Sequence, residues 1–174
     1  MNVGPTSELD DAPIFLVGFM GAGKTTVGRA LARHLECAFF DLDELIAARA
    51  GKSVQEIFAQ LGEAEFRSLE SAAIDSCRHM VRSVVALGGG AYVSEENRAS
   101  LRAIGKTVWL DCPIEICLKR ISGDKSRPLL GDEDDMRPLF VRRRAAYAQA
   151  DYAVQAGDLS PEELAIEITT ALSK

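Results

Sequence analysis

A glycine-rich segment, GFMGAGKT at residues 18–25, lies between a short apolar run and an amphipathic stretch. It matches the pattern G-x-x-x-x-G-K-[ST] at every required position. Residues 14–17 before it are predicted to form a buried strand, and residues 24–36 carry apolar side chains on one helical face. Such a loop turns backbone N–H groups towards phosphate oxygens at the positive end of a helix. The alternative, a strand–helix turn with an accidental Lys-Thr, leaves this context unexplained.

We therefore expect this segment, called the phosphate loop below, to bind a nucleoside triphosphate. Lys24 is predicted to reach the β- and γ-phosphates, and the Thr25 hydroxyl to ligate Mg²⁺. The chain lacks the Asn-Lys-x-Asp motif of a GTPase and the length usual for a motor ATPase, so a small-molecule kinase fits better. The predicted ATP-binding residues in this segment are Gly21, Ala22, Gly23, Lys24, Thr25 and Thr26.

Short apolar runs alternate with helical patterns along the whole chain, which predicts an α/β fold with a five-stranded parallel sheet flanked by helices. After the second strand the patterns predict two helical pieces, one that starts at Ser53 and stops at Gly62, and one from Glu63 to about Met80. Ligands bind such sheets at the carboxyl ends of the strands. We therefore expect the loops after Val17, Phe40 and Leu87 to share one crevice. The predicted strands are residues 14–17, 38–40, 84–87, 107–110 and 152–154, and the other predicted helices are 94–105, 113–121, 136–150 and one that opens at 160–163.

The 174 residues fit one domain, and the net charge of −6 argues against a protein that coats nucleic acid. No apolar run is long enough to span a membrane, and Asp10 and Asp11 stand where a signal peptide would be basic. The four cysteines show no pairing framework, which favours a reducing compartment. We therefore expect a cytoplasmic protein with no nucleic-acid or membrane partner. Residues 1–12 are expected to form a flexible tail.

Asp41-Leu42-Asp43 follows the second strand. If this stretch is extended, residues two apart face the same way, so both carboxylates can point into the crevice. One could hold Mg²⁺ or its water while the other faces an acceptor hydroxyl. The alternative is an acidic helix start with Asp43 as the N-cap.

Two further segments offer an arginine and bare backbone. In GEAEFRSLE at 62–70, Arg67 neighbours the buried face and can contact a carboxylate or phosphate, or it can pair in solvent with Glu63 or Glu70. Gly88, Gly89 and Gly90 follow the third strand and let the backbone approach a ligand, unless they form only a flexible turn.

Basic residues also occur in the last third of the chain. Residues 122–135 are aperiodic and carry Arg127, which fits a lid that offers positive charge to a phosphoryl group. Arg143 shares a predicted helix face with Phe140 and Tyr147, so it is expected to point inward. Its neighbours, Arg142 and Arg144, are expected to be solvated.

Six motifs together resemble shikimate kinase, in order and approximate spacing, from about residue 14 to 152. They are GFMGAGKT, DLD at 41–43, GEAEFRSLE, the 88–90 glycines, RPLL at 127–130 and R-x-x-x-Y at 143–147. The resemblance implies the three-layer sandwich of P-loop nucleoside triphosphate hydrolases, of the nucleoside monophosphate kinase-like type with a lid. It implies transfer of the ATP γ-phosphate to the 3-hydroxyl of shikimate, on the chorismate pathway to aromatic amino acids.

The same resemblance assigns roles by position. Asp43, Lys24 and Arg127 would be catalytic, Arg120 and Arg127 would join the ATP-binding set, and Asp41 would support Mg²⁺ through water beside Thr25. Shikimate would be held by Asp43, Arg67, Gly88, Gly89, Gly90 and Arg143. The single domain, 13–174, would divide into a core (13–41, 71–121 and 136–174), a shikimate-binding segment (42–70) and a lid (122–135). We expect a monomer whose partners are ATP and shikimate.

Three alternatives remain open at this point. A gluconate kinase should carry a histidine after the second-strand acid, but none lies between His34 and His79. A nucleoside monophosphate kinase must also bind a base, for which the predicted acceptor segment offers few aromatic residues. A non-catalytic ATP-binding regulator should lose Asp43, Arg127 or Lys24, and all three are present.

Overall fold

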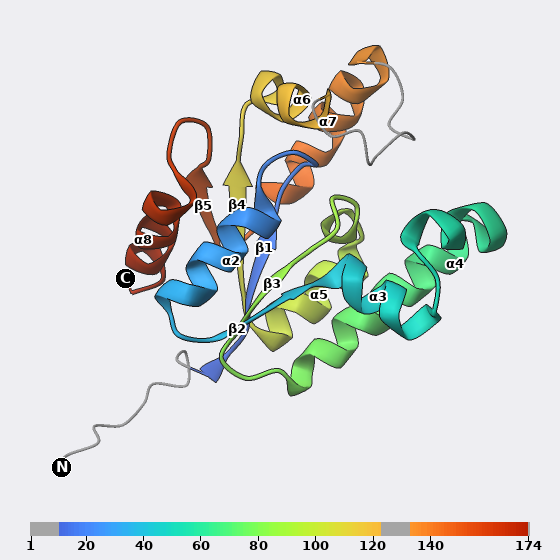
Figure 1. The fold of residues 1–174 in the computed structure, drawn as a ribbon, viewed down its shortest axis with the longest axis horizontal. Coiled ribbons are helices and arrows are strands. Elements are labelled where there is room, and N and C mark those ends of the chain that lie inside the picture. Colours follow the sequence, from blue (N-terminus) through green and yellow to red (C-terminus); the bar gives the residue numbers. More distant parts are fainter. Residues whose placement is uncertain (1–10, 123–132, 174) are drawn as a thin grey trace.

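A computed structural model describes residues 11–122 and 133–173 (Figure 1). Its centre is a parallel sheet with the strand order β2-β3-β1-β4-β5, which confirms the predicted α/β fold. Both the expected tail, apart from residues 11 and 12, and most of the expected lid lie outside the described residues. The strands are β1 (Ile14–Val17), β2 (Ala38–Asp41), β3 (Ser83–Ala86), β4 (Lys106–Asp111) and β5 (Tyr152–Gln155).

The strand β1 lies in the middle of the sheet and pairs in parallel with both β3 and β4. Phe15 is opposite Val85 on one side and Thr107 on the other. The chain goes from β1 outward to β2 and β3, and later crosses β1 to reach β4. This reversal leaves a crevice at the carboxyl end of β1, where the phosphate loop begins.

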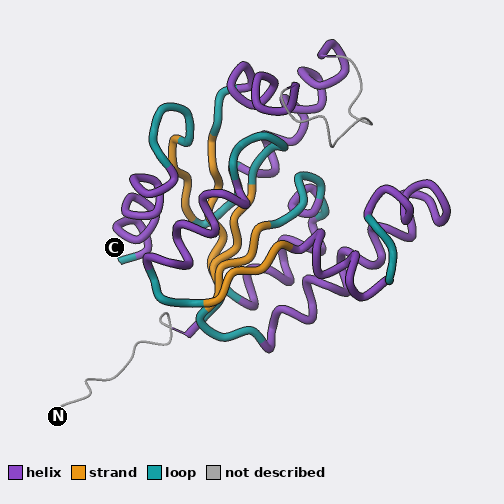
Figure 2. Tube along the Cα trace, viewed as in Figure 1, coloured by secondary structure: helices purple, strands orange, loops and turns teal. Residues whose placement is uncertain are grey.

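Helices cover both faces of the sheet, as the tube in Figure 2 shows. A methyl group on Gly28 of α2 would lie 3.3 Å from Leu16, whereas one on Gly105, just after α5, would lie 3.1 Å from Phe15. Because adjacent strand residues face opposite sides, α2 and α5 pack on opposite faces of β1. The helices are α2 (Lys24–His34), α3 (Leu42–Ala50), α4 (Val54–Ser76), α5 (Glu95–Ile104), α6 (Ile114–Ser122), α7 (Glu133–Tyr147) and α8 (Pro161–Leu172), with 3₁₀ turns η1 (Cys77–His79) and η2 (Ala91–Val93).

The predicted helix starts at Ser53 and Ser160 are confirmed. Each serine side chain accepts a hydrogen bond from the backbone of the glutamate three residues later, and that glutamate bonds back to the serine backbone N–H at 2.8 Å. Two otherwise unpaired N–H groups are satisfied at each helix start in this way.

The predicted interruption at Gly62 is also confirmed, because α4 contains a kink there. Gly62 has φ 82° and ψ 173°, a backbone conformation that is strongly unfavourable for residues other than glycine. The second part of α4 ends at Ser76 rather than near Met80, and the turn η1 follows it.

Of the two alternatives for residues 41–43, the structure has the helix start rather than an extended stretch. Helix α3 starts at Leu42, and Asp41, not Asp43, is its N-cap: the Asp41 carboxylate accepts a hydrogen bond from the Asp43 backbone N–H at 3.1 Å. Leu42 and Ile46, four residues apart, are the buried residues of this short helix. In the described parts of the chain, no helix has the length and apolar character needed to cross a membrane.

Candidate active site

The carboxyl ends of β1, β2 and β3 open into a cavity of about 370 Å³, called the loop cavity here. It confirms the expectation that the three loops share one crevice. Residues of the phosphate loop form one wall, and Asp41, Asp43 and the start of the 88–90 glycines form another. The lining residues are Met20, Gly21, Gly23, Lys24, Thr25, Thr26, Asp41, Asp43, Leu87, Gly88, Gly89, Arg120 and Ile121.

The phosphate loop has the backbone that its glycines predict. Gly18, Gly21 and Gly23 have φ values of 147°, 77° and 95°, which glycine adopts without the steric cost of a Cβ. The Lys24 Nζ donates to the carbonyl oxygens of Gly18 and Phe19, both at 2.9 Å. The ammonium group is therefore folded onto the loop, within reach of any phosphate bound there.

The Thr25 hydroxyl donates to Asp41 Oδ2 at 2.9 Å. This contact places two oxygen ligands of the kind that Mg²⁺ prefers side by side at the phosphate loop. Among the described residues, no group of three or more His, Cys, Asp or Glu side chains could hold a metal by itself. A site of few protein oxygens fits Mg²⁺, since that ion keeps several waters and is completed by substrate phosphates.

A second cavity, of about 610 Å³, lies on the other side of the glycine triplet and is called the arginine cavity here. Arg67 on α4 and Arg142 and Arg143 on α7 line it, and Gly90 forms part of its floor. Its other lining residues are Glu63, Ser68, Glu70, Ser71, Val93, Ser94, Glu96, Asn97 and Leu139.

The triplet separates the two cavities, and each of its glycines faces a different side chain. A methyl group on Gly88 would lie 2.9 Å from Asp43 Oδ1, one on Gly89 would lie 3.3 Å from an Arg143 nitrogen, and one on Gly90 would lie 2.6 Å from an Arg67 nitrogen. The backbone of the triplet is therefore approached closely, as expected, and the groups that approach it in this structure are protein side chains. The absence of three Cβ atoms lets one carboxylate and two guanidinium groups converge on a short piece of backbone.

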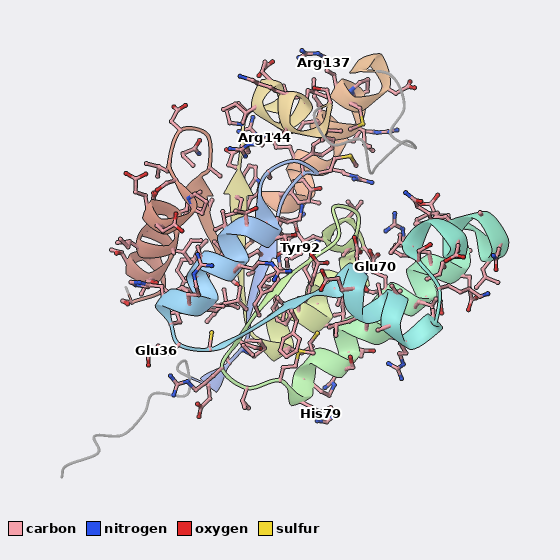
Figure 3. The ribbon with its side chains drawn as sticks, viewed as in Figure 1. Glu36, Glu70, His79, Tyr92, Arg137 and Arg144 are labelled. Atoms are coloured by element: carbon pink, nitrogen blue, oxygen red, sulfur yellow. The ribbon has the colours of Figure 1, made fainter. Side chains whose placement is uncertain are left out.

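Both readings of Arg67 describe part of its surroundings. It pairs with Glu70 at 2.9 Å and with Glu63 at 3.2 Å, as the ion-pair alternative predicted, yet it also lines the arginine cavity. Glu70, labelled on α4 in Figure 3, is buried, with 1% of its surface exposed. Burial raises the pKa of the Glu70 carboxyl, while the adjacent Arg67 guanidinium opposes that rise. The pair fixes the Arg67 guanidinium beside Gly90.

On α7 the predicted inward face is confirmed. Tyr147 is 1% exposed, Phe140 meets the Phe19 ring edge to face at 5.2 Å, and Arg143 between them is half-buried beside Gly89. Arg144, labelled in Figure 3, is exposed as expected, but it also pairs with Asp111 at 2.9 Å and lies over the Trp109 ring at 5.5 Å.

Arg120 closes the loop cavity from α6. Its guanidinium donates to the carbonyl oxygens of Gly21 and Ala22 at 3.2 and 3.4 Å, and it lies 3.7 Å from the Cys112 sulfur. The pKa of the Cys112 thiol is lowered to about 7, mainly by a hydrogen bond with Cys117 and further by the Arg120 charge. Arg120 thus reaches the phosphate loop, in a position compatible with nucleotide binding.

The structure brings every predicted site residue to these two cavities except Ala22, which is buried in the phosphate loop, and Arg127. Arg127 lies outside the described residues. From the sequence, Glu70 was expected only as a partner of Arg67 in solvent and Tyr147 only on the inward helix face, so the burial of Glu70 and the contact between Tyr147 and Gly89 were missed. It also missed the contact between Arg144 and Asp111, since no local pattern links residues this far apart.

Comparison with known proteins identifies the family. A family model described as shikimate kinase matches residues 20–173. The chain belongs to the shikimate kinase family. A shikimate kinase from Geobacter sulfurreducens is 44% identical to it over 164 residues, which cover 92% of this chain and 91% of that protein. The predicted family membership is thus confirmed.

Solved structures agree with the family. A shikimate kinase from Acinetobacter baumannii, in complex with shikimate, is 37% identical with a TM-score of 0.87 over 93% of both chains. The nucleoside monophosphate kinase-like P-loop fold expected from the resemblance is therefore confirmed. A gluconokinase from Sinorhizobium meliloti is 17% identical with a TM-score of 0.62, over 93% of this chain and 91% of its own, and shows a shared fold alone.

Proposed function

We propose that this member of the shikimate kinase family transfers the γ-phosphoryl group of ATP to the 3-hydroxyl of shikimate. The products are shikimate 3-phosphate and ADP, and the step belongs to chorismate and aromatic amino acid biosynthesis. The observation that carries the proposal is the glycine triplet, which separates a phosphate-binding loop from a pair of converging arginines and has Asp43 at the junction.

On the ATP side, the phosphate loop binds the triphosphate through its backbone N–H groups. The Lys24 ammonium exchanges the carbonyls of Gly18 and Phe19 for phosphate oxygens and neutralises charge on the transferring group. Thr25 and, through water, Asp41 would hold Mg²⁺, which supplies further positive charge to the phosphates when bound. Arg120 contributes to nucleotide binding from the edge of the loop cavity.

On the acceptor side, Arg67 and Arg143 bind the shikimate carboxylate from two directions. Two guanidinium groups suit a planar carboxylate, since each offers a fork of N–H donors. Because Gly88, Gly89 and Gly90 have no side chains, the ring of shikimate can lie directly against their backbone. Asp43 orients the 3-hydroxyl towards the γ-phosphate and accepts its proton late in the transfer.

Three parts of the proposal rest on sequence rather than on described contacts. Arg127 is proposed to offer positive charge to the phosphoryl group, because its motif resembles that of the family. The chain is proposed to act as a monomer with no nucleic-acid or membrane partner. A cytoplasmic location is supported by the cysteines, which are all free and so suit a reducing compartment.

An ADP-release assay tests the reaction with shikimate, gluconate and a panel of nucleoside monophosphates as acceptors. We expect turnover only when shikimate is the acceptor. Faster turnover of gluconate or a nucleotide would overturn the proposed acceptor, and ATP binding without turnover of any compound would favour a regulator.

Arg67→Ala then tests the carboxylate site, with Arg33→Ala as the matched control because Arg33 pairs on the surface with Glu162 at 3.2 Å. We expect Arg67→Ala to raise the shikimate KM strongly and leave the ATP KM nearly unchanged. A shikimate analogue without the carboxylate should barely distinguish wild type from this variant. A parallel loss of ATP affinity would instead assign Arg67 to the nucleotide.

A further inference from the structure

Tyr147 joins two parts of the acceptor site that come from distant segments of the chain. Its hydroxyl donates a hydrogen bond to the Gly89 carbonyl oxygen, and the Arg143 guanidinium lies over the same glycine, where its charge acts on the phenolic oxygen. The hydroxyl therefore links the middle glycine of the triplet, which follows β3, to the arginine one helical turn before it on α7.

The surroundings of Tyr147 hold this hydroxyl in place. The side chain is 1% exposed, and its ring packs against Trp109 with the centroids 6.3 Å apart. Burial raises the pKa of Tyr147 to about 12, so the hydroxyl keeps its proton at neutral pH. The hydroxyl therefore donates its proton to the Gly89 carbonyl oxygen and presents its lone pairs to the nearby Arg143 charge.

The Arg143 guanidinium lies beside the same glycine that accepts the Tyr147 hydrogen bond. A methyl group on Gly89 would lie 3.3 Å from an Arg143 nitrogen, so the guanidinium already lies directly over the glycine. Without the phenolic oxygen, the long Arg143 side chain would regain rotamer freedom, which binding would then have to remove.

We propose that the Tyr147 hydroxyl is a positioning group for the acceptor: it holds the Arg143 guanidinium against the Gly89 backbone, so that both meet the acceptor in one fixed arrangement. The inference rests on the proposed function in one respect, namely that Arg143 and the triplet bind the acceptor. Tyr147 acts through Arg143 and Gly89 and does not itself touch the reacting atoms.

The test is Tyr147→Phe, which removes the hydroxyl and keeps the ring. Tyr92→Phe is the matched control: Tyr92, labelled in Figure 3, is 0% exposed and lines neither cavity, and its hydroxyl lies 3.2 Å from both the Thr107 hydroxyl and the Gln149 carbonyl oxygen. Both variants lose one buried hydroxyl with two partners, so a loss of stability alone should affect them alike. KM for each substrate, kcat and Tm are measured for both.

We expect Tyr147→Phe to raise the acceptor KM by up to about tenfold, the scale of one lost buried hydrogen bond, with the ATP KM and kcat within about twofold of wild type. Tyr92→Phe should lower Tm and leave the acceptor KM unchanged. An unchanged acceptor KM in Tyr147→Phe, or equal KM changes in the two variants, would overturn the proposal.

A double-variant cycle with Arg143→Ala adds a readout that a purely structural role would not move. If Tyr147 acts through Arg143, then Tyr147→Phe should change the acceptor KM less than about twofold once Arg143 is gone. Independent effects that multiply would contradict the proposal.

The assays use whichever acceptor of the panel the wild-type protein phosphorylates fastest. If that acceptor is gluconate or a nucleotide, the proposed function fails while the Tyr147 proposal is still tested with that compound. If the wild-type protein phosphorylates no compound of the panel, both proposals are overturned.

Discussion

At the scale of single residues, the site depends as much on missing side chains as on present ones. The types of residue that carry the proposed chemistry were predictable, because Lys24, Asp43, Arg67 and Arg143 stand in recognisable motifs. Their pairing was not predictable. That Gly88 faces Asp43 while Gly90 faces Arg67 follows from where α3 and α4 carry these side chains relative to the triplet, and sequence spacing does not contain this information.

Lys24→Met tests the phosphate loop. The lysine charge should stabilise the phosphoryl group in transfer more than bound ATP, so we expect kcat to fall by about 10²-fold or more. Steady-state ADP release at saturating shikimate measures this loss. Near-normal turnover would show that the charge at this position does not act on the reacting phosphate.

Asp43→Asn tests the proposed proton acceptor. Asparagine keeps the size and still accepts a hydrogen bond but cannot take the proton, so kcat should fall by about 10²–10⁴-fold while the fold and ATP affinity are retained. Asp41→Asn is the matched control, since Asp41 contacts Thr25 at 2.9 Å and its defect should be partly rescued by added Mg²⁺. Wild-type turnover in Asp43→Asn, with an Mg²⁺-insensitive loss in Asp41→Asn, would exchange the two roles.

At the scale of elements, sequence patterns predicted the strands and the capped helices well, because each has a strong local signal. For helix α3 the sequence left two alternatives open, because the alternation in Asp41-Leu42-Asp43 looks like a strand and the buried residues of the helix are Leu42 and Ile46 alone. The helix start was one of them, but its N-cap is Asp41, the last residue of β2, and not Asp43. Arg144 is exposed as expected, but its partner was missed because Asp111 is brought to it only by tertiary packing.

Gly62→Asn tests the kink in α4 against Gly51→Asn at the end of α3. A methyl group on either glycine meets nothing within 4 Å, so any cost must come from the backbone. Gly51 has the left-handed conformation (φ 63°, ψ 24°), which asparagine tolerates. Gly62 has a different conformation (φ 82°, ψ 173°), which asparagine does not tolerate. Urea unfolding should show a loss of about 1–3 kcal/mol for Gly62→Asn and little change for Gly51→Asn. Equal losses would mean that the kink carries no special backbone cost.

At the scale of the whole molecule, both cavities are built on one sheet and one hydrophobic core. Buried residues of this core come from β1 beside the phosphate loop, from α4 beside Arg67 and from α7 beside Arg143. The two binding regions should therefore unfold together. The division of the chain into core, shikimate-binding segment and lid remains a prediction from the resemblance.

Thermal unfolding with each ligand tests this cooperativity. We expect one transition, whose Tm rises with either Mg·ATP or shikimate alone. At a ligand concentration about 100-fold above Kd, the gain of about 2.7 kcal/mol corresponds to a rise of roughly 5–10 °C for a chain of this size. Two separate transitions, each shifted by only one ligand, would show that the acceptor segment unfolds independently.

The sequence contains a single tryptophan, Trp109, and its position makes it an optical reporter of helix α7. The indole is almost fully buried on β4, with the Arg144 guanidinium over its face and the Tyr147 ring beside it. All tryptophan emission therefore originates at one place, and both of these neighbours are carried by the helix that also presents Arg143. A displacement of α7 during binding would change the intensity or wavelength of that emission, so the unlabelled protein can report the event in a stopped-flow fluorimeter.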